Sequence, residues 1–105
     1  MDSANIRQRI NLQGLSIIRI YPSDNDLMNY PREKLNRNVA AYKENGELVW
    51  LIQECPVGGL DQDKAYMNIQ VKDEQLIAGN WVGLDFVVDL KSGNVTPYKI
   101  GVRPW

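Results

Sequence analysis

The side chains that could perform acid–base or metal chemistry are few in this sequence and lie far apart. The chain of 105 residues has no histidine and a single cysteine, Cys55. Because histidine is the commonest general base and metal ligand, its absence excludes Ser–His–Asp and Cys–His nucleophiles and transition-metal sites. Carboxylate, lysine, tyrosine or hydroxyl chemistry remains, and nothing in the sequence positions such groups together. We therefore predict a protein that is not an enzyme, with no catalytic residue, no metal and no cofactor.

Acidic side chains are frequent in two polar stretches, residues 23–38 and 54–64. We take five of them as candidate partner contacts: Asp24, Asp26, Glu54, Asp61 and Asp63. One interpretation is a surface that steers a basic partner by complementary charge. The other is a pair of solvated loops, because aspartate is common in turns for its own local hydrogen bonding. Both interpretations stay open at this point.

The spacing of Asp61 and Asp63 also resembles the start of a calcium loop, but the pattern fails. An EF-hand loop needs further oxygen ligands at fixed offsets and a distal bidentate glutamate. Ala65 and Tyr66 follow instead. The pair Gly58-Gly59 similarly lacks the spacing of a phosphate-binding loop. We expect neither a metal ion nor a nucleotide in this stretch.

Tryptophan is enriched at binding hot spots, so an exposed tryptophan is a candidate partner contact. Trp50 shares its strand parity with Leu48 and Ile52, which predicts a core position. Trp81 has the opposite parity from the apolar row of its own strand. We therefore add Trp81 to the candidate partner contacts.

The charge balance narrows the range of partners. The chain has 12 Lys and Arg residues against 13 Asp and Glu residues, a net charge of −1. The basic residues are scattered, which disfavours binding to nucleic acid or to an anionic membrane. No stretch approaches the ~20 apolar residues that span a bilayer, and the first residues lack a signal-peptide pattern. With one cysteine, these features predict a soluble, cytoplasmic protein.

Short strands are the elements that must carry these residues. The length suits one domain, residues 1–105, and the apolar fraction of 44% is ordinary for a globular protein. A hydrophobic period of two, broken by turn residues, predicts strands over 6–12, 15–21, 39–43, 48–52, 66–72, 76–80, 81–90 and 95–100. The segments 76–80 and 81–90 can also form one bent strand. The pattern indicates an all-β antiparallel meander of seven or eight short strands, as a curved sheet or a small sandwich.

Two segments leave a helical alternative. In residues 4–12, Ile6 and Ile10 also fit the spacing of a short helix, although we favour a strand. In the stretch 23–38, Pro31 is a suitable start for one helical turn over residues 32–36. A polar connection of this length is often functional.

Turns and parities give sharper expectations. Asn45-Gly46 predicts a hairpin with a type I′ turn, in which both central residues have positive φ. The turn after residue 72 is expected over 73–75. Alternation predicts that Met67, Ile69 and Val71 share one face, and that Phe86 is buried within the apolar row of residues 82–90.

Residues 36–50 resemble one blade segment of a quinoprotein-type propeller, but a single segment cannot make a propeller. A wider resemblance rests on N-R-N-V-x-x-Y-x-x-N-G-x-x-x-W-x-I over residues 36–52, Y-x-x-I-x-V-K-D-x-x-L over 66–76 and W-x-G-x-x-x-x-V-D-x-x-[ST]-G over 81–93. In this order of features the chain is similar to small standalone β-rich bacterial proteins, some of which are immunity proteins of toxin–immunity systems.

The resemblance implies a non-enzymatic binding protein that binds and blocks a cognate toxin domain. The two loops, 23–38 and 54–64, would carry the contacts, because binding residues concentrate on loops held by a rigid sheet. An alternative is a scaffold module that self-associates or pairs by a sheet edge. A carboxylate enzyme is the least favoured alternative, since a domain of this size has little room for a deep cleft.

Overall fold

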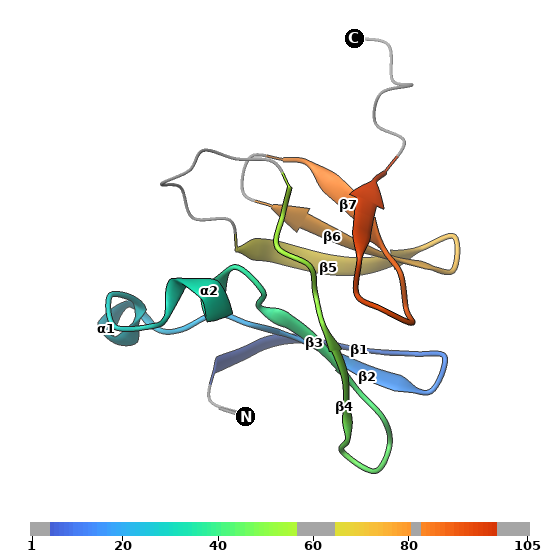
Figure 1. The fold of residues 1–105 in the computed structure, drawn as a ribbon, viewed down its shortest axis with the longest axis horizontal. Coiled ribbons are helices and arrows are strands. Elements are labelled where there is room, and N and C mark those ends of the chain that lie inside the picture. Colours follow the sequence, from blue (N-terminus) through green and yellow to red (C-terminus); the bar gives the residue numbers. More distant parts are fainter. Residues whose placement is uncertain (1–4, 57–64, 81–82, 99–105) are drawn as a thin grey trace, which may run out of the picture.

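The computed structural model describes residues 5–56, 65–80 and 83–98, which form two four-stranded antiparallel sheets (Figure 1). Sheet A contains β1 (Ile6–Leu12), β2 (Leu15–Ile20), β3 (Val39–Tyr42) and β4 (Leu48–Leu51). Sheet B contains β5 (Tyr66–Lys72), β6 (Gln75–Asn80), β7 (Asp85–Val88) and β8 (Val95–Pro97). In each sheet the strands follow the chain order. The predicted all-β antiparallel meander is confirmed, and the two sheets share one hydrophobic core.

Two hairpin turns have a backbone conformation that matches the right-handed twist of the flanking strands. Gln13 and Gly14, between β1 and β2, have φ values of 50° and 80°. Asp73 and Glu74, between β5 and β6, have φ values of 53° and 65°. Positive φ at both central residues is typical of a type I′ turn. The described part of the segment 4–12 contributes a strand, β1, rather than a helix, and Gln75 begins β6 instead of extending the turn.

The predicted type I′ turn at Asn45-Gly46 is wrong. In this hairpin only Gly46 has positive φ, at 87°. The Gly46 amide donates to the Lys43 carbonyl at 2.9 Å, and the Lys43 amide donates to the Glu47 carbonyl at 2.9 Å. This is a type I turn over Glu44 and Asn45, followed by glycine in the left-handed region as a bulge. The extra loop residue accompanies a register shift between β3 and β4.

The core lies between the two sheets. Phe86 and Val88 of β7 are buried, and Leu84 packs against the same cluster, which confirms the predicted parity of that row. The rings of Phe86 and Tyr66 meet edge to face, with centroids 6.5 Å apart and planes at 88°. Trp50 is buried as predicted, whereas Leu48, at the start of β4, is 47% exposed.

The predicted alternation of β5 holds from Asn68 onward but fails at its start, at Tyr66 and Met67. Tyr66 and Ile69 are buried, whereas Met67 and Val71 are 39% and 44% exposed. A register shift between Tyr66 and Asn68 explains the burial of Tyr66, because a bulge changes which residues of a strand face the core; Ile69 and Val71 share a face, with Val71 nearer the end of the strand.

The polar stretch 23–38 contains two helical turns where one was predicted. They are α1 (Asp24–Leu27) and α2 (Arg32–Leu35), and α2 begins after Pro31 as expected. Leu35 anchors α2 by its burial, but α1 buries no residue. Met28, which follows α1, is 93% exposed.

The chain from residue 76 to 90 forms two separate strands, β6 and β7, rather than one bent strand. The Asn80 side chain closes their connection, because its Oδ1 accepts the Leu84 amide at 2.9 Å. The last described strand, β8, ends at Pro97, whereas the prediction extended to residue 100. Residues 99 and 100 lie outside the described part.

Two side-chain amides join sheet A to the edge strand β5 of sheet B. The Asn38 Nδ2 donates to the Tyr66 carbonyl at 2.9 Å, and its Oδ1 accepts the Tyr66 amide at 2.9 Å. The Gln8 side chain repeats this pairing at Ile69, with distances of 3.1 Å and 3.0 Å. Each side-chain amide takes the place of a backbone peptide of a neighbouring strand. This pairing partly covers an edge that would otherwise be open to another chain.

Candidate binding surface on the outer face of sheet A

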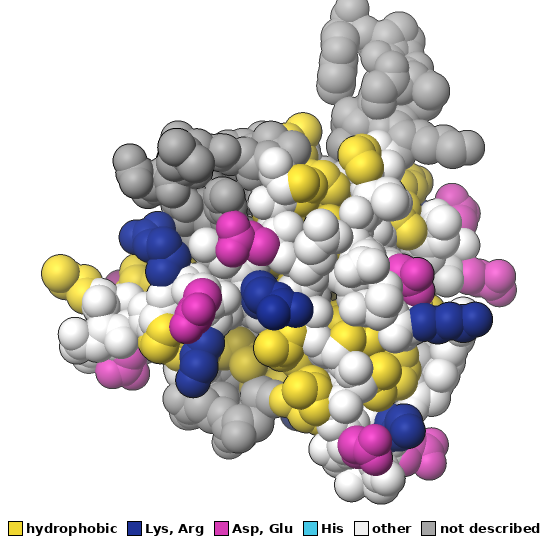
Figure 2. Space-filling model, viewed as in Figure 1, with side chains coloured by type: hydrophobic (Ala, Val, Ile, Leu, Met, Phe, Trp, Pro, Cys, Tyr) yellow, Lys and Arg dark blue, Asp and Glu magenta, His cyan; other side chains and the backbone are white. Residues whose placement is uncertain are grey.

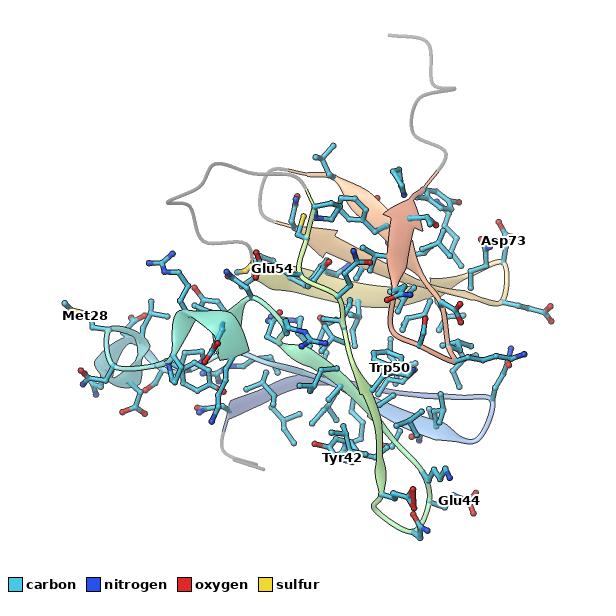
Figure 3. The ribbon with its side chains drawn as sticks, in the orientation of Figure 1. Met28, Tyr42, Glu44, Trp50, Glu54 and Asp73 are labelled. Atoms are coloured by element: carbon cyan, nitrogen blue, oxygen red, sulfur yellow. The ribbon has the colours of Figure 1, made fainter. Side chains whose placement is uncertain are left out.

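The described acidic candidates are not assembled into one patch. Asp24 and Asp26 are exposed in the single turn of α1, where the Ser23 hydroxyl donates to the Asp26 carboxylate at 3.2 Å. Figure 2 shows acidic side chains spread over the visible face. Glu54 is exposed and is separated from α1 by α2 (Figure 3). Asp61, Asp63 and Trp81 lie outside the described residues.

Sheet A is apolar on both of its faces. Ile17, Val39 and Ala41 belong to the core between the sheets. Their neighbours Ile18 and Ala40, which pair across β2 and β3, have the opposite parity. In Figure 3, Trp50 lies between the two sheets and Tyr42 lies on the other side of sheet A. A strand that is apolar on both faces indicates that its second face also avoids water.

Two adjoining hollows cover this outer face, and we call them together the outer groove. One, beside α2, has a volume of about 450 Å³ and is lined by Ile20, Tyr30, Pro31, Lys34, Arg37, Asn38, Ala40, Tyr42 and Leu51. The other has a volume of about 410 Å³ and is lined by Ile6, Arg9, Ser16, Ile18, Tyr42, Lys43, Glu44 and Gly46. Tyr42 lines both, so the two hollows lie next to each other on sheet A.

A third hollow extends this surface toward α1. Its volume is about 490 Å³, and its lining shares Tyr30 with the hollow beside α2 and includes the exposed Met28. The loop 23–38 therefore borders the outer groove. The sequence predicts contacts from this loop, but through its aspartates rather than through apolar residues.

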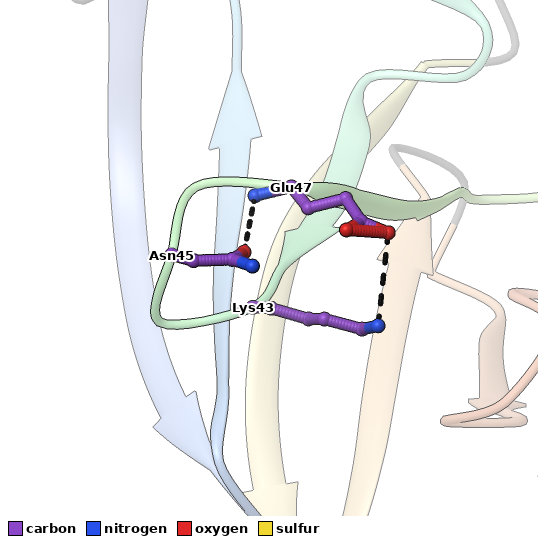
Figure 4. A network of polar contacts seen from close by, with 3 residues as sticks. All are labelled: Lys43, Asn45 and Glu47. Atoms are coloured by element: carbon purple, nitrogen blue, oxygen red, sulfur yellow. Dashed lines mark hydrogen bonds and ion pairs between the residues drawn. The ribbon is translucent and has the colours of Figure 1, made fainter.

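The charged residues that line the outer groove are mostly cationic. They comprise four basic side chains and one acidic side chain: Arg9, Lys34, Arg37, Lys43 and Glu44. The Lys43 ammonium lies 3.7 Å from the carboxylate of Glu47, whose own amide donates to the Asn45 side chain at 2.9 Å (Figure 4). In the part of the chain that the structure describes, the hollow beside α2 is lined by two cations and no carboxylate. This end of the groove is thus locally positive in a chain whose net charge is −1.

Arg37 is held in place at the rim of the groove. Its Nε donates to the Ile52 carbonyl at 2.9 Å, and its Nη2 donates to the Leu51 carbonyl at 3.2 Å. A guanidinium has five N–H donors, so three remain beyond these two bonds. Because the side chain is already ordered, binding a carboxylate there costs less conformational entropy than it would at a free arginine.

Two groups with shifted pKa values lie away from the groove. Burial raises the pKa of the Tyr66 hydroxyl above its ordinary value, and that hydroxyl donates to the Gln53 carbonyl at 2.8 Å. Partial burial lowers the pKa of the Arg19 guanidinium, and the positive charge of Arg7 acts in the same direction. The Arg19 Nε donates to the Gln8 side chain at 2.6 Å, so this arginine supports the contact between the sheets.

The described residues contain no cluster of three or more His, Cys, Asp or Glu side chains that could hold a metal ion. Within the same ranges, no helix is long and apolar enough to cross a membrane.

The fold and this surface together define a small two-sheet β-protein with an apolar, cationic groove on one outer face. Comparison with family models gives the family. The model described as a domain of unknown function, DUF7957, matches residues 3–100, and the chain belongs to this family. The comparisons found no match among curated proteins and none among solved structures.

Arg37, Tyr42 and Leu51 are not among the candidate contacts predicted from the sequence. A usable signal was present, because β2 and β3 carry apolar residues at both parities. Such strands are buried on both faces in a protein or in a complex.

Proposed function

We propose that this protein is a non-enzymatic binding protein, and specifically an immunity protein that binds and blocks a toxin domain. The observation that supports binding is the outer groove, two adjacent hollows on a largely apolar sheet face, with the ordered, charged Arg37 at the rim. Exposed apolar surface rimmed by polar groups is typical of an interaction site. The resemblance of residues 36–52, 66–76 and 81–93 to small β-rich bacterial proteins, some of which are immunity proteins, supports the toxin as the partner.

The proposed mechanism is steric occlusion. The strands β2 and β3 form the floor of the groove and also contribute to the core between the sheets. A partner seated on this floor meets a surface that needs little rearrangement, which favours affinity because little ordering is required. The protein would cover a functional surface of the toxin and would need no cofactor. Binding in the cytoplasm, where a producing cell needs protection, is part of this proposal.

A pull-down from the native cell tests the proposed function. The expected result is one tight protein partner whose activity is lost when an equimolar amount of this chain is added. A partner that keeps its full activity at saturation would contradict the immunity function, although it would leave a binding function in place. Absence of any partner would count against both.

One observation favours the scaffold alternative. The β4 strand is an edge of sheet A, and its Leu48 and Leu51 are 47% and 39% exposed. An exposed apolar edge strand can pair with a second copy of the chain. Sedimentation over a range of protein concentrations separates the two functions, since self-association predicts a dimer that dissociates on dilution.

A further inference from the structure

We infer that the outer groove takes an acidic protein segment, in which an apolar side chain is flanked by carboxylates. This inference rests on the proposed binding function and names the chemistry of the partner. It differs from the hypothesis of the sequence analysis, in which acidic loops of this chain meet a basic partner. Here the charges are reversed and the contact surface is a sheet face.

The charged side chains of the outer groove favour an acidic partner. Among the described residues, the cations Lys34 and Arg37 line the hollow beside α2 and no carboxylate does. At the other end, Arg9 and Lys43 are balanced by Glu44 and by Glu47, which pairs with Lys43, so the positive excess lies beside α2. A basic segment would meet an excess of like charges, whereas an acidic segment would find complementary ones. The groove therefore selects carboxylates.

The apolar floor of the groove favours an apolar side chain on the partner. Ala40 of β3 lies at the base of the hollow beside α2, between Tyr42 of the same strand and Leu51 of β4. Leu51 is 39% exposed, so it retains apolar surface that a partner can bury. Tyrosine and arginine are enriched among residues that dominate binding energy. An apolar side chain seated on this floor would contribute the hydrophobic part of the affinity.

The position of Arg37 favours a carboxylate next to that apolar side chain. Carbonyls of Leu51 and Ile52 fix its guanidinium at the side of the apolar floor. An arginine with free N–H donors recognises a carboxylate by two parallel hydrogen bonds. A partner that places a carboxylate next to its apolar anchor would use both features at once. This adjacency is why the occupant is an acidic segment with an apolar anchor.

A titration of the full chain with synthetic peptides tests the inference. One peptide has a central Phe-Leu pair flanked by glutamates, and the matched control peptide has lysines in place of the glutamates. Amide NMR shifts report where each peptide binds. We expect the glutamate peptide to shift Ala40, Tyr42 and Leu51, and to bind at least about tenfold more tightly than the lysine peptide. Equal affinities, or shifts confined to sheet B, would overturn the inference.

Two variants and a control locate the contact. Lys34→Glu should weaken binding of the glutamate peptide about tenfold, and Arg37→Gln should do the same. Arg37→Gln also removes the two bonds to β4, so Lys34→Glu, on the exposed surface of α2, keeps the test valid if Arg37→Gln unfolds. The control is Lys91→Glu, an equal charge change in an exposed turn before β8. If Lys91→Glu weakens binding as much as Lys34→Glu, the effect is one of net charge, and the inference is wrong.

A single-stranded oligonucleotide serves as the competing probe, because tyrosines and cations also bind nucleic acid. Tighter binding of the oligonucleotide than of the glutamate peptide at Tyr42 would overturn the inference. These outcomes are distinguishable from failure of the proposed function. A chain that neutralises a toxin equally well with Lys34→Glu keeps the function and loses the inference, whereas peptide binding without neutralisation does the opposite.

Discussion

Replacing Asn38 with alanine removes one of the two side-chain amides that pair with the backbone of β5. Asn38 is only 4% exposed, and Tyr66, whose backbone it pairs with, is fully buried. The Asn38 Nδ2 also donates to the Ile20 carbonyl at 2.8 Å, so the substitution removes three hydrogen bonds in all. We expect Asn38→Ala to be among the more destabilising single substitutions in the chain.

The magnitude follows from the groups that the substitution leaves behind. The buried amide and carbonyl of Tyr66 lose their side-chain partner, and each such loss costs about 1–3 kcal/mol. The Ile20 carbonyl is only partly buried, so water can replace the lost bond at a cost of about 1 kcal/mol or less. The sum is about 4 kcal/mol, a large part of the ~5–15 kcal/mol that stabilises a typical domain.

Urea denaturation followed by tryptophan fluorescence provides the assay. With a slope of about 2 kcal/mol per M, the transition midpoint of Asn38→Ala should fall by about 2 M. The matched control is Asn94→Ala, the same chemical change at an exposed position, which should stay within about 0.5 kcal/mol of wild type. A loss below about 1 kcal/mol for Asn38→Ala would refute the idea that its amide holds β5 against sheet A.

Three further predictions concern the turn, the core and alkaline stability. Gly46→Val should lower the free energy of unfolding by about 1–2 kcal/mol, because φ at this position is 87°, and Gly46→Asn should lose less; equal losses in urea denaturation would contradict the turn geometry. Phe86→Ala should cost about 3–5 kcal/mol by the same assay, and a small loss would mean that the core does not centre on this ring. Because the pKa of Tyr66 is raised in the folded protein, its contribution to the free energy of unfolding is complete below the unfolded pKa of about 10 and declines as pH rises above it. Urea midpoints should therefore fall above that pH, and Tyr66→Phe should make the fall shallower. An unchanged slope for Tyr66→Phe would contradict the role of the hydroxyl.

The strands and their order could be predicted because the signals are local. Alternation over residues 6–12 and turn residues such as Gln13-Gly14 depend only on neighbours in the chain. The turn at Asn45-Gly46 was placed correctly but given the wrong type. Its sequence satisfies both a type I′ turn and a type I turn with a glycine bulge, and the register between β3 and β4 selects the second.

The facing at the start of β5 could not be predicted because it depends on distant residues. The bulge between Tyr66 and Asn68 coincides with the pairing of Tyr66 and Asn38, which are 28 residues apart in the sequence. No periodicity within β5 carries that information. A second strand or side chain must be placed before the facing of Tyr66 is defined.

The outer groove could be predicted only in part. Apolar residues at both parities of β2 and β3 signal a second apolar face. The cations of the groove come from β1, from α2, from Arg37 two residues after α2 and from the start of the β3–β4 turn, so this arrangement requires the three-dimensional fold. Composition alone gave a net charge of −1 and drew attention to the acidic loops instead.

The most direct test of the central claim compares the wild-type chain and three variants against the partner captured from the native cell. The variants are Lys34→Glu in the outer groove, Lys91→Glu as the control and the double substitution of Asp24 and Asp26 by lysine on α1. Isothermal titration gives each affinity. The outer groove predicts a loss of at least about tenfold for Lys34→Glu alone, with the other two close to wild type. Unchanged affinity for Lys34→Glu, together with a loss for the α1 variant, would contradict the account and support the acidic loop.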